Sequence, residues 1–196
     1  MRDTGSTALR ADAARNRHNL LSAATLAFEQ ADTAPSMREI ARAAGVGVGT
    51  LYRHFPTREA LVDAVFRDQA DRLTDGAAAF LRDLSPDEAL RQWMDLFGSW
   101  LATKRGMLGT LLAGADRDGK HAASRHQVIA AINALLDAGR ANGAVRHDID
   151  SEDLVASLVG IFTVAGDPAQ RAQAARLLDL LMDGLRASRN SSKPSR

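Results

Sequence analysis

The sequence predicts an all-α fold of about nine helices. Alanine and leucine are abundant, whereas β-branched and aromatic residues are few, and this balance favours helix over sheet. Apolar residues recur three and four positions apart, as they do on one face of a helix. All five prolines lie between such patterns or at the start of one, which are the places where a helical chain tolerates proline.

Length and composition narrow the class of protein. The chain has 196 residues, of which 45% are hydrophobic, with a formal net charge of +1 and no cysteine, so disulfides and thiolate chemistry are excluded. The first 19 residues are polar and charged and lack the apolar core of a signal peptide. The longest nearly apolar run, residues 154–166, is too short to cross a bilayer. We therefore expect a soluble cytoplasmic protein with no membrane partner.

Apolar stripes and capping residues define the first four helices. Residues 1–11 are expected to be a disordered tail, and the apolar positions 20, 21, 24 and 28 then form the inner face of a helix over about 12–31. Ser36 is placed to cap a helix over 37–44, and Gly45 supplies the left-handed residue that ends it. A short helix over about 48–54 follows, and Thr57 caps a helix from Arg58 to about Leu84.

The remaining helices follow from similar signals. Ser85, Pro86 and Glu88 form a capping sequence and open a helix that continues past residue 101. A short helix over about 107–113 precedes a polar break, and a longer helix covers about 122–142. The last two helices span about 151–165, capped by Asp150 or Ser151, and about 168–188. Residues 189–196 are polar and are expected to be a second disordered tail.

Residues 36–55 fit two short helices that cross at a tight turn. Met37, Ile40 and Ala41 share one face of the first helix. Val46 enters the same core, and Leu51 and Phe55, one turn apart, return to it from the second helix, which makes a helix-turn-helix. Gly49 then lies on the opposite, outer face and leaves it bare, so that another molecule can approach closely. The major groove of DNA is a natural partner for such a helix.

The run SMREIARAAGVGVGTLYRHFPTREAL, residues 36–61, resembles the DNA-binding signature of TetR-family regulators. The match covers about residues 15–66, with the turn glycine, GTLYRHF and TREAL in register. LATKRGMLGTLLA and LLDLLMDGLRA, nearer the C-terminus, are further similar to the SbtR-like branch of the family. The resemblance implies a helix-turn-helix DNA-binding domain over 12–57 and a helical ligand-binding and dimerisation domain over 58–188.

The resemblance also assigns roles in DNA binding. The second short helix would enter the major groove. The residues that meet base edges would be Arg38, Val48, Gly49 and Tyr52, and those that hold phosphates would be Ser36, Thr50, His54 and Arg58. Hydroxyl, imidazole and guanidinium groups are suitable phosphate donors, and Arg38 could read guanine. Two alternatives remain open: His54 could edge the core, and Arg58 could be a solvated helix residue.

A small-molecule effector and a homodimer are implied in the same way. The candidates for a ligand pocket are Trp93, Phe97, Trp100, Met107, Leu111 and Phe162. For Trp93, Phe97 and Trp100 the alternative is plain core packing of one helix stripe. The last two helices are apolar over most of their circumference, which predicts that a second subunit covers one side. The candidates for this interface are Val155, Leu158, Val159, Phe162, Leu177, Leu178, Leu181 and Leu185.

The sequence contains no recognisable arrangement of nucleophile, base and orienting group. We therefore expect no enzymatic activity, no cofactor and no metal site. The expected function is that of a homodimeric repressor of the TetR type, which a small molecule releases from a palindromic operator in double-stranded DNA. The alternative is a helical interaction or scaffold module that does not bind DNA.

Overall fold

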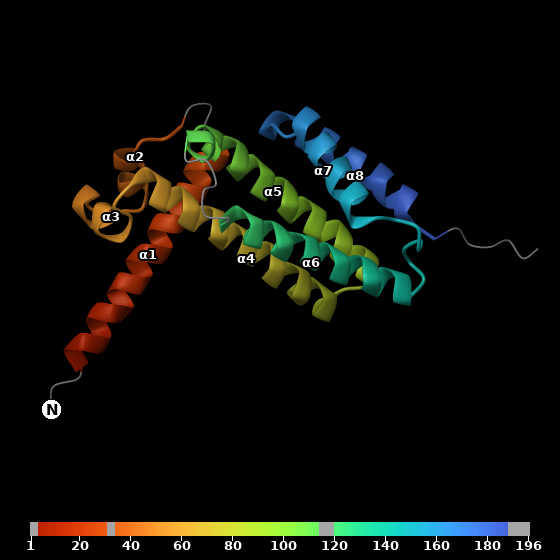
Figure 1. The fold of residues 1–196 in the computed structure, drawn as a ribbon, viewed down its shortest axis with the longest axis horizontal. Helices are drawn as coiled ribbons and strands as arrows, with labels where there is room; N and C mark the ends of the chain where they lie inside the picture. The colour runs from red at the N-terminus through yellow and green to blue at the C-terminus, as the bar shows by residue number, and fades with distance from the viewer. Residues whose placement is uncertain (1–3, 31–33, 114–119, 188–196) are drawn as a thin grey trace, which may run out of the picture. The chain divides into compact units, whose positions relative to one another are not determined.

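The computed structural model describes residues 4–30, 34–113 and 120–187, and these ranges are helical almost throughout (Figure 1). The prediction of an all-α fold is confirmed. Within these ranges the one β-type pairing is an isolated bridge between Val145 and Arg186. The elements are α1 (Thr4–Gln30), α2 (Met37–Ala43), α3 (Val48–His54), α4 (Arg58–Asp83), α5 (Pro86–Ala113), α6 (Lys120–Ala141), α7 (Ser151–Val164), a short 3-10 helix η1 (Pro168–Gln170) and α8 (Arg171–Leu185).

Two expected boundaries are corrected by the structure. Residues 4–11, expected to be part of a disordered tail, continue α1 towards the N-terminus, because their alanines, leucine and arginine all favour helix. The expected short helix over 107–113 is the end of α5. The segment between Leu101 and Met107 holds no proline, and the single Gly106 costs only about 1 kcal/mol in a helix. The tail residues 1–3 and 189–196 lie outside the described residues.

The chain divides into two compact units. The first combines Met1–Asp71 with Ser99–Ser124, and the second combines Arg72–Gly98 with Arg125–Arg196. The boundaries of these units fall within α4, α5 and α6, whereas the sequence suggested a division after residue 57. The functional division into residues 12–57 and 58–188 stays a prediction.

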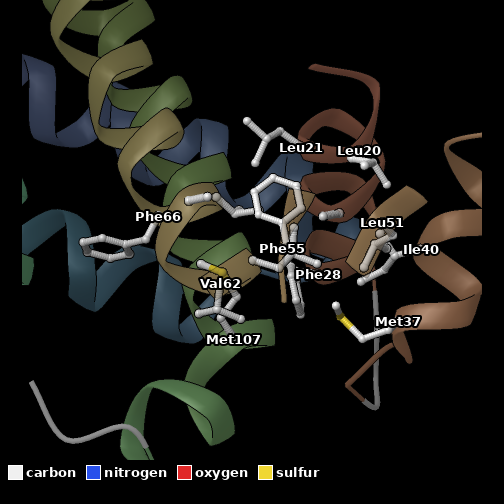
Figure 2. Packing of buried hydrophobic residues seen from close by; sticks show 14 of the residues in the cluster. Leu20, Leu21, Phe28, Met37, Ile40, Leu51, Phe55, Val62, Phe66 and Met107 are labelled. Carbon is white, nitrogen blue, oxygen red and sulfur yellow. The ribbon is translucent and has the colours of Figure 1, made fainter. Parts of the chain in front are cut away.

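The core of the first unit joins α1, α2 and α3 to the start of α4 and the later part of α5. Figure 2 shows side chains from these helices converging on one apolar cluster. Full burial of each such side chain contributes roughly 1.5–3 kcal/mol. Val46, which the sequence placed in this core, is only partly buried at its edge. The labelled members of the cluster are Leu20, Leu21, Phe28, Met37, Ile40, Leu51, Phe55, Val62, Phe66 and Met107.

The second unit is built from the end of α4, the start of α5, and α6, α7 and α8. Helices α7 and α8 pack against each other (Figure 1). The ring of Phe162 lies against Gly98, where an added Cβ would overlap it, so this glycine permits a close helix contact. Asp150 caps α7 by accepting a hydrogen bond from the N–H of Glu152 at 2.7 Å, which decides between the two predicted caps. None of the described helices combines the length and apolarity needed to span a bilayer.

Candidate DNA-binding site

The start of α2 is held by a reciprocal cap. The Ser36 hydroxyl accepts a hydrogen bond from the Glu39 N–H at 3.2 Å, and the Glu39 carboxylate accepts from the Ser36 N–H at 2.8 Å. The same carboxylate also accepts from the Ser36 hydroxyl at 2.8 Å. These bonds, with the backbone N–H first, hold the pKa of Glu39 below its usual value. Ser36 is confirmed as the cap of α2.

The turn between α2 and α3 has the geometry that the sequence predicted. Gly45 adopts a φ of +69°, which only glycine adopts at little cost. The N–H of Val46 bonds to the carbonyl oxygen of Ala41 at 3.0 Å, and the N–H of Gly45 bonds to that of Arg42 at 3.1 Å. This pair of bonds is the Schellman arrangement, which satisfies the last carbonyls of a helix. The turn therefore fixes where α3 begins.

Helix α3 is anchored on one side and open on the other. Leu51 is fully buried and Phe55, which ends the helix, is 3% exposed. On the outer side, Val48 is 41% and Tyr52 47% exposed. A Cβ added at Gly49 would meet no atom within 4 Å, so the backbone there is bare. Because one side of α3 is anchored in the core, its exposed side forms a fixed surface that could enter the major groove of DNA.

The other residues predicted to contact DNA differ in how exposed their side chains are. Arg38 and Ser36 are exposed, whereas Thr50 and His54 are half-buried. The ring of His54 lies 6.3 Å from that of Phe55 at a tilt of 45°, so His54 borders the core and also reaches the surface. The hydroxyl of Ser36 donates to Glu39, and a phosphate could take this proton only if that bond were given up. These four roles stay predictions.

The side chain of Arg58 makes contacts within the protein that the sequence did not predict. It is half-buried, its Nη1 donates to the carbonyl oxygen of Pro35 at 2.5 Å, and its Cζ lies 5.5 Å from the ring centroid of Phe28. In the free protein the guanidinium is thus engaged within the first unit. The phosphate role of Arg58 stays a prediction.

The candidate pocket residues behave as core residues where the structure describes them. Trp93, Phe97 and Phe162 are buried in the second unit. Met107 is buried in the first unit, and Trp100 packs against the core cluster there, with its ring 5.9 Å from that of Phe66. The side chain of Leu111 lies outside the described residues. A ligand pocket formed by these residues therefore stays a prediction, and packing accounts for their positions.

Four of the eight candidate interface residues lie inside the chain, which corrects half of that prediction. They are Leu158, Phe162, Leu178 and Leu185. Val159 is exposed, and Val155, Leu177 and Leu181 are half-buried. Val164 and Leu180, which were not among the candidates, are 63% and 67% exposed. The outer apolar face of α7 and α8, meaning their apolar side chains that stay at least partly exposed, includes Val155, Val159, Leu177, Leu180 and Leu181 and, on another side of α7, Val164.

Sequence reasoning missed three features of the site. Glu39 completes the cap of α2, and the spacing Ser36-x-x-Glu39 was a readable signal for it. The guanidinium of Arg17 lies over the ring of Phe55 at 5.6 Å and thus ties α1 to the end of α3. The inward turn of Arg58 is the third. No local sequence pattern predicts the contacts of Arg17 and Arg58, because each contact joins residues that are far apart in the sequence.

Comparison with known proteins agrees with this architecture. Residues 20–65 match the family model of bacterial regulatory proteins of the tetR family, and residues 85–187 match that of the SbtR-like transcriptional regulator C-terminal domain. The HTH-type transcriptional repressor KstR2 of Rhodococcus jostii is 28% identical over 191 residues, covering 86% of this chain and 89% of the repressor.

Two solved structures share the fold at appreciable identity. The TetR transcriptional regulator SCO0520 from Streptomyces coelicolor is 44% identical with a TM-score of 0.81, covering 88% of this chain and 99% of that one. A TetR regulatory protein from Mycobacterium vanbaalenii is 36% identical with a TM-score of 0.74, covering 91% and 99%. The chain therefore belongs to the TetR family of transcriptional regulators, with an SbtR-like C-terminal domain, and is a DNA-binding regulator and not an enzyme.

Proposed function

We propose that this regulator is a homodimeric repressor that binds a palindromic operator through α3 and the start of α2. A small-molecule effector would release it. The observation that carries the proposal is the two-sided character of α3. Leu51 and Phe55 hold the helix in the core, while Val48, Gly49 and Tyr52 form an open outer face.

In this proposal each residue on α3 has a chemical role. Tyr52 supplies a ring and a hydroxyl to the base edges, and Val48 offers apolar contact, for instance to a thymine methyl group. Gly49 lets the helix backbone approach the groove closely. Arg38, exposed in the first turn of α2, would form two hydrogen bonds with a guanine. Thr50 and His54 would hold phosphates on either side and set the register.

The exposed apolar residues of α7 and α8 support a dimer. Val164 and Leu180 are each more than half exposed, and large exposed apolar side chains that gather in one patch mark interaction surfaces. A two-fold axis through this face would make the same patch serve both subunits. Two recognition helices would then face two half-sites of a palindrome.

The effector role requires a difference in affinity between two states. A small molecule can release the operator only if it binds the DNA-free form more tightly than the DNA-bound form. Its binding site is proposed to lie in the helical C-terminal domain, where Trp93 and Phe97 pack together in the second unit.

The test is a gel-shift titration with the DNA that lies upstream of the regulator's own gene. The wild-type protein should shift this DNA, and Tyr52→Ala should abolish the shift while leaving the oligomeric state unchanged in analytical ultracentrifugation. A Tyr52→Ala protein that binds as well as wild type would contradict the groove assignment. A wild-type protein that binds no DNA from this region, or from a genome-wide footprint, would favour the scaffold alternative.

A further inference from the structure

We infer that Arg58 is a positioning residue for DNA binding, which fastens the segment before α2 to α1 and α4 and does not hold a phosphate of the operator. The inference rests on the proposed function, because it concerns how the helix-turn-helix is presented to DNA. Arg58 is the first residue of α4. It reaches a backbone carbonyl and an aromatic ring from two other parts of the first unit.

The two contacts link Arg58 to the end of α1 and to the residue before the cap of α2. Phe28 lies in the last turn of α1, and Pro35 stands directly before Ser36, the cap of α2. The Nη1 of Arg58 donates to the Pro35 carbonyl oxygen at 2.5 Å, and its Cζ lies 5.5 Å from the Phe28 ring centroid. One side chain therefore joins the end of α1, the start of α2 and the start of α4.

The chemistry of the contacts favours a guanidinium over an ammonium. The planar group can donate in its plane while its face lies on an aromatic ring. A cation in the first turn of a helix is disfavoured by the helix dipole, and the carbonyl oxygen and the ring supply the negative potential that offsets this. A lysine ammonium has a shorter reach and no planar face, so it is less able to keep both contacts.

Fixing Pro35 fixes the start of α2. Ser36 follows directly, and its hydroxyl and N–H are both bonded to Glu39. Arg38, proposed to read a base, lies in the same first turn, and α2 packs on α3. Loss of the Arg58 contacts would therefore loosen the orientation of α2 relative to α4 and reduce DNA affinity through α2.

Salt dependence separates positioning from phosphate contact. Each phosphate that a protein cation neutralises adds about 0.9 to the slope of log affinity against log salt. Removing a phosphate-bound arginine from both subunits of a dimer would lower this slope by about 2. Removing a positioning arginine lowers the affinity and leaves the slope unchanged.

The experiment compares wild type with Arg58→Lys and Arg58→Met in operator titrations from low to moderate salt. We expect both variants to bind about tenfold more weakly at every salt concentration, with slopes equal to wild type. Arg67→Met, which removes an exposed arginine of the same helix, is the matched control and should bind like wild type. Wild-type affinity in Arg58→Lys, or a slope lowered by about 2 in Arg58→Met, would overturn the inference.

A second measurement does not depend on DNA or on the methionine variant. Arg58→Lys keeps the charge and a long apolar stem, so it folds whichever role Arg58 has. Amide hydrogen exchange of the free protein should quicken at Ile40 and neighbouring α2 amides in Arg58→Lys, and unchanged exchange there would overturn the inference. A wild-type protein that binds no DNA would contradict the proposed function alone, because the exchange result still decides whether Arg58 positions α2.

Discussion

The indole N–H of Trp93 donates to the carbonyl oxygen of Leu73 at 2.8 Å, which joins α5 to α4 inside the second unit. Trp93 is fully buried, and its ring lies 5.6 Å from that of Phe97. A buried indole N–H needs a hydrogen-bond acceptor, and here the protein itself supplies one. Trp93 therefore serves the core, and its polar group is already satisfied before any effector binds.

Trp93→Phe tests this role. The change removes a buried donor and leaves a small cavity, so the free energy of unfolding should fall by about 1–3 kcal/mol. Denaturant titration at several protein concentrations would measure it, because a dimer's stability depends on concentration. Wild-type stability together with an altered effector response would instead place Trp93 in a ligand pocket.

Leu178 and Leu180 provide a matched pair on α8. Leu178 is fully buried, and Leu180, two residues later on the opposite side of the helix, is 67% exposed. Leu178→Ala should therefore lower the free energy of unfolding by about 2–5 kcal/mol. Leu180→Ala should leave the fold intact and shift the dimer towards monomer in sedimentation experiments, because the outer apolar face loses contact area.

The dimer prediction fails if Leu180→Ala and a second variant, Val164→Ser, both sediment as wild type does at all concentrations. In that case the outer face of α7 and α8 is not the interface. Loss of folding in Leu180→Ala would equally contradict the assignment, since a side chain that is 67% exposed contributes little to the core of one chain.

The helix-turn-helix could be predicted in detail because its determinants are local. Gly45 ends α2 through a conformation that other residues rarely adopt, and Leu51 and Phe55 are spaced by one helical turn. Ser36 precedes the helix that it caps. Each of these signals lies within a few residues of the feature it determines, so the sequence alone was enough.

The outward faces of α7 and α8 could be predicted only in part. Both helices carry apolar residues around most of their circumference, so hydropathy alone does not tell the inner from the outer side. Leu158 and Leu178 pack inward, whereas Leu180 and Val164 face out. This choice depends on which side meets the rest of the second unit, and that contact is a property of the fold and not of the local sequence.

The cap of α2 predicts a pH dependence. The pKa of Glu39 is lowered in the folded state by its bonds with Ser36, so the stabilisation is present above the usual pKa of about 4.5 and is lost as the pH falls through the lower, folded value. Glu39→Gln does not titrate, so the stability difference between wild type and variant should shrink on acidification. Thermal unfolding across this range measures the difference, and a constant difference would contradict the role of the cap.

Substitution of Gly49 should change stability and DNA binding in opposite directions. A Cβ at this position meets no atom within 4 Å in the free protein, and alanine is favoured over glycine inside a helix by about 0.8–1.0 kcal/mol. Gly49→Ala should therefore raise the melting temperature and also weaken operator binding, because the added methyl group stands where the groove approaches. Calorimetry and a gel shift on the same sample measure the two effects. Unweakened binding in this more stable variant would show that the bare face of α3 is not the surface that meets the DNA.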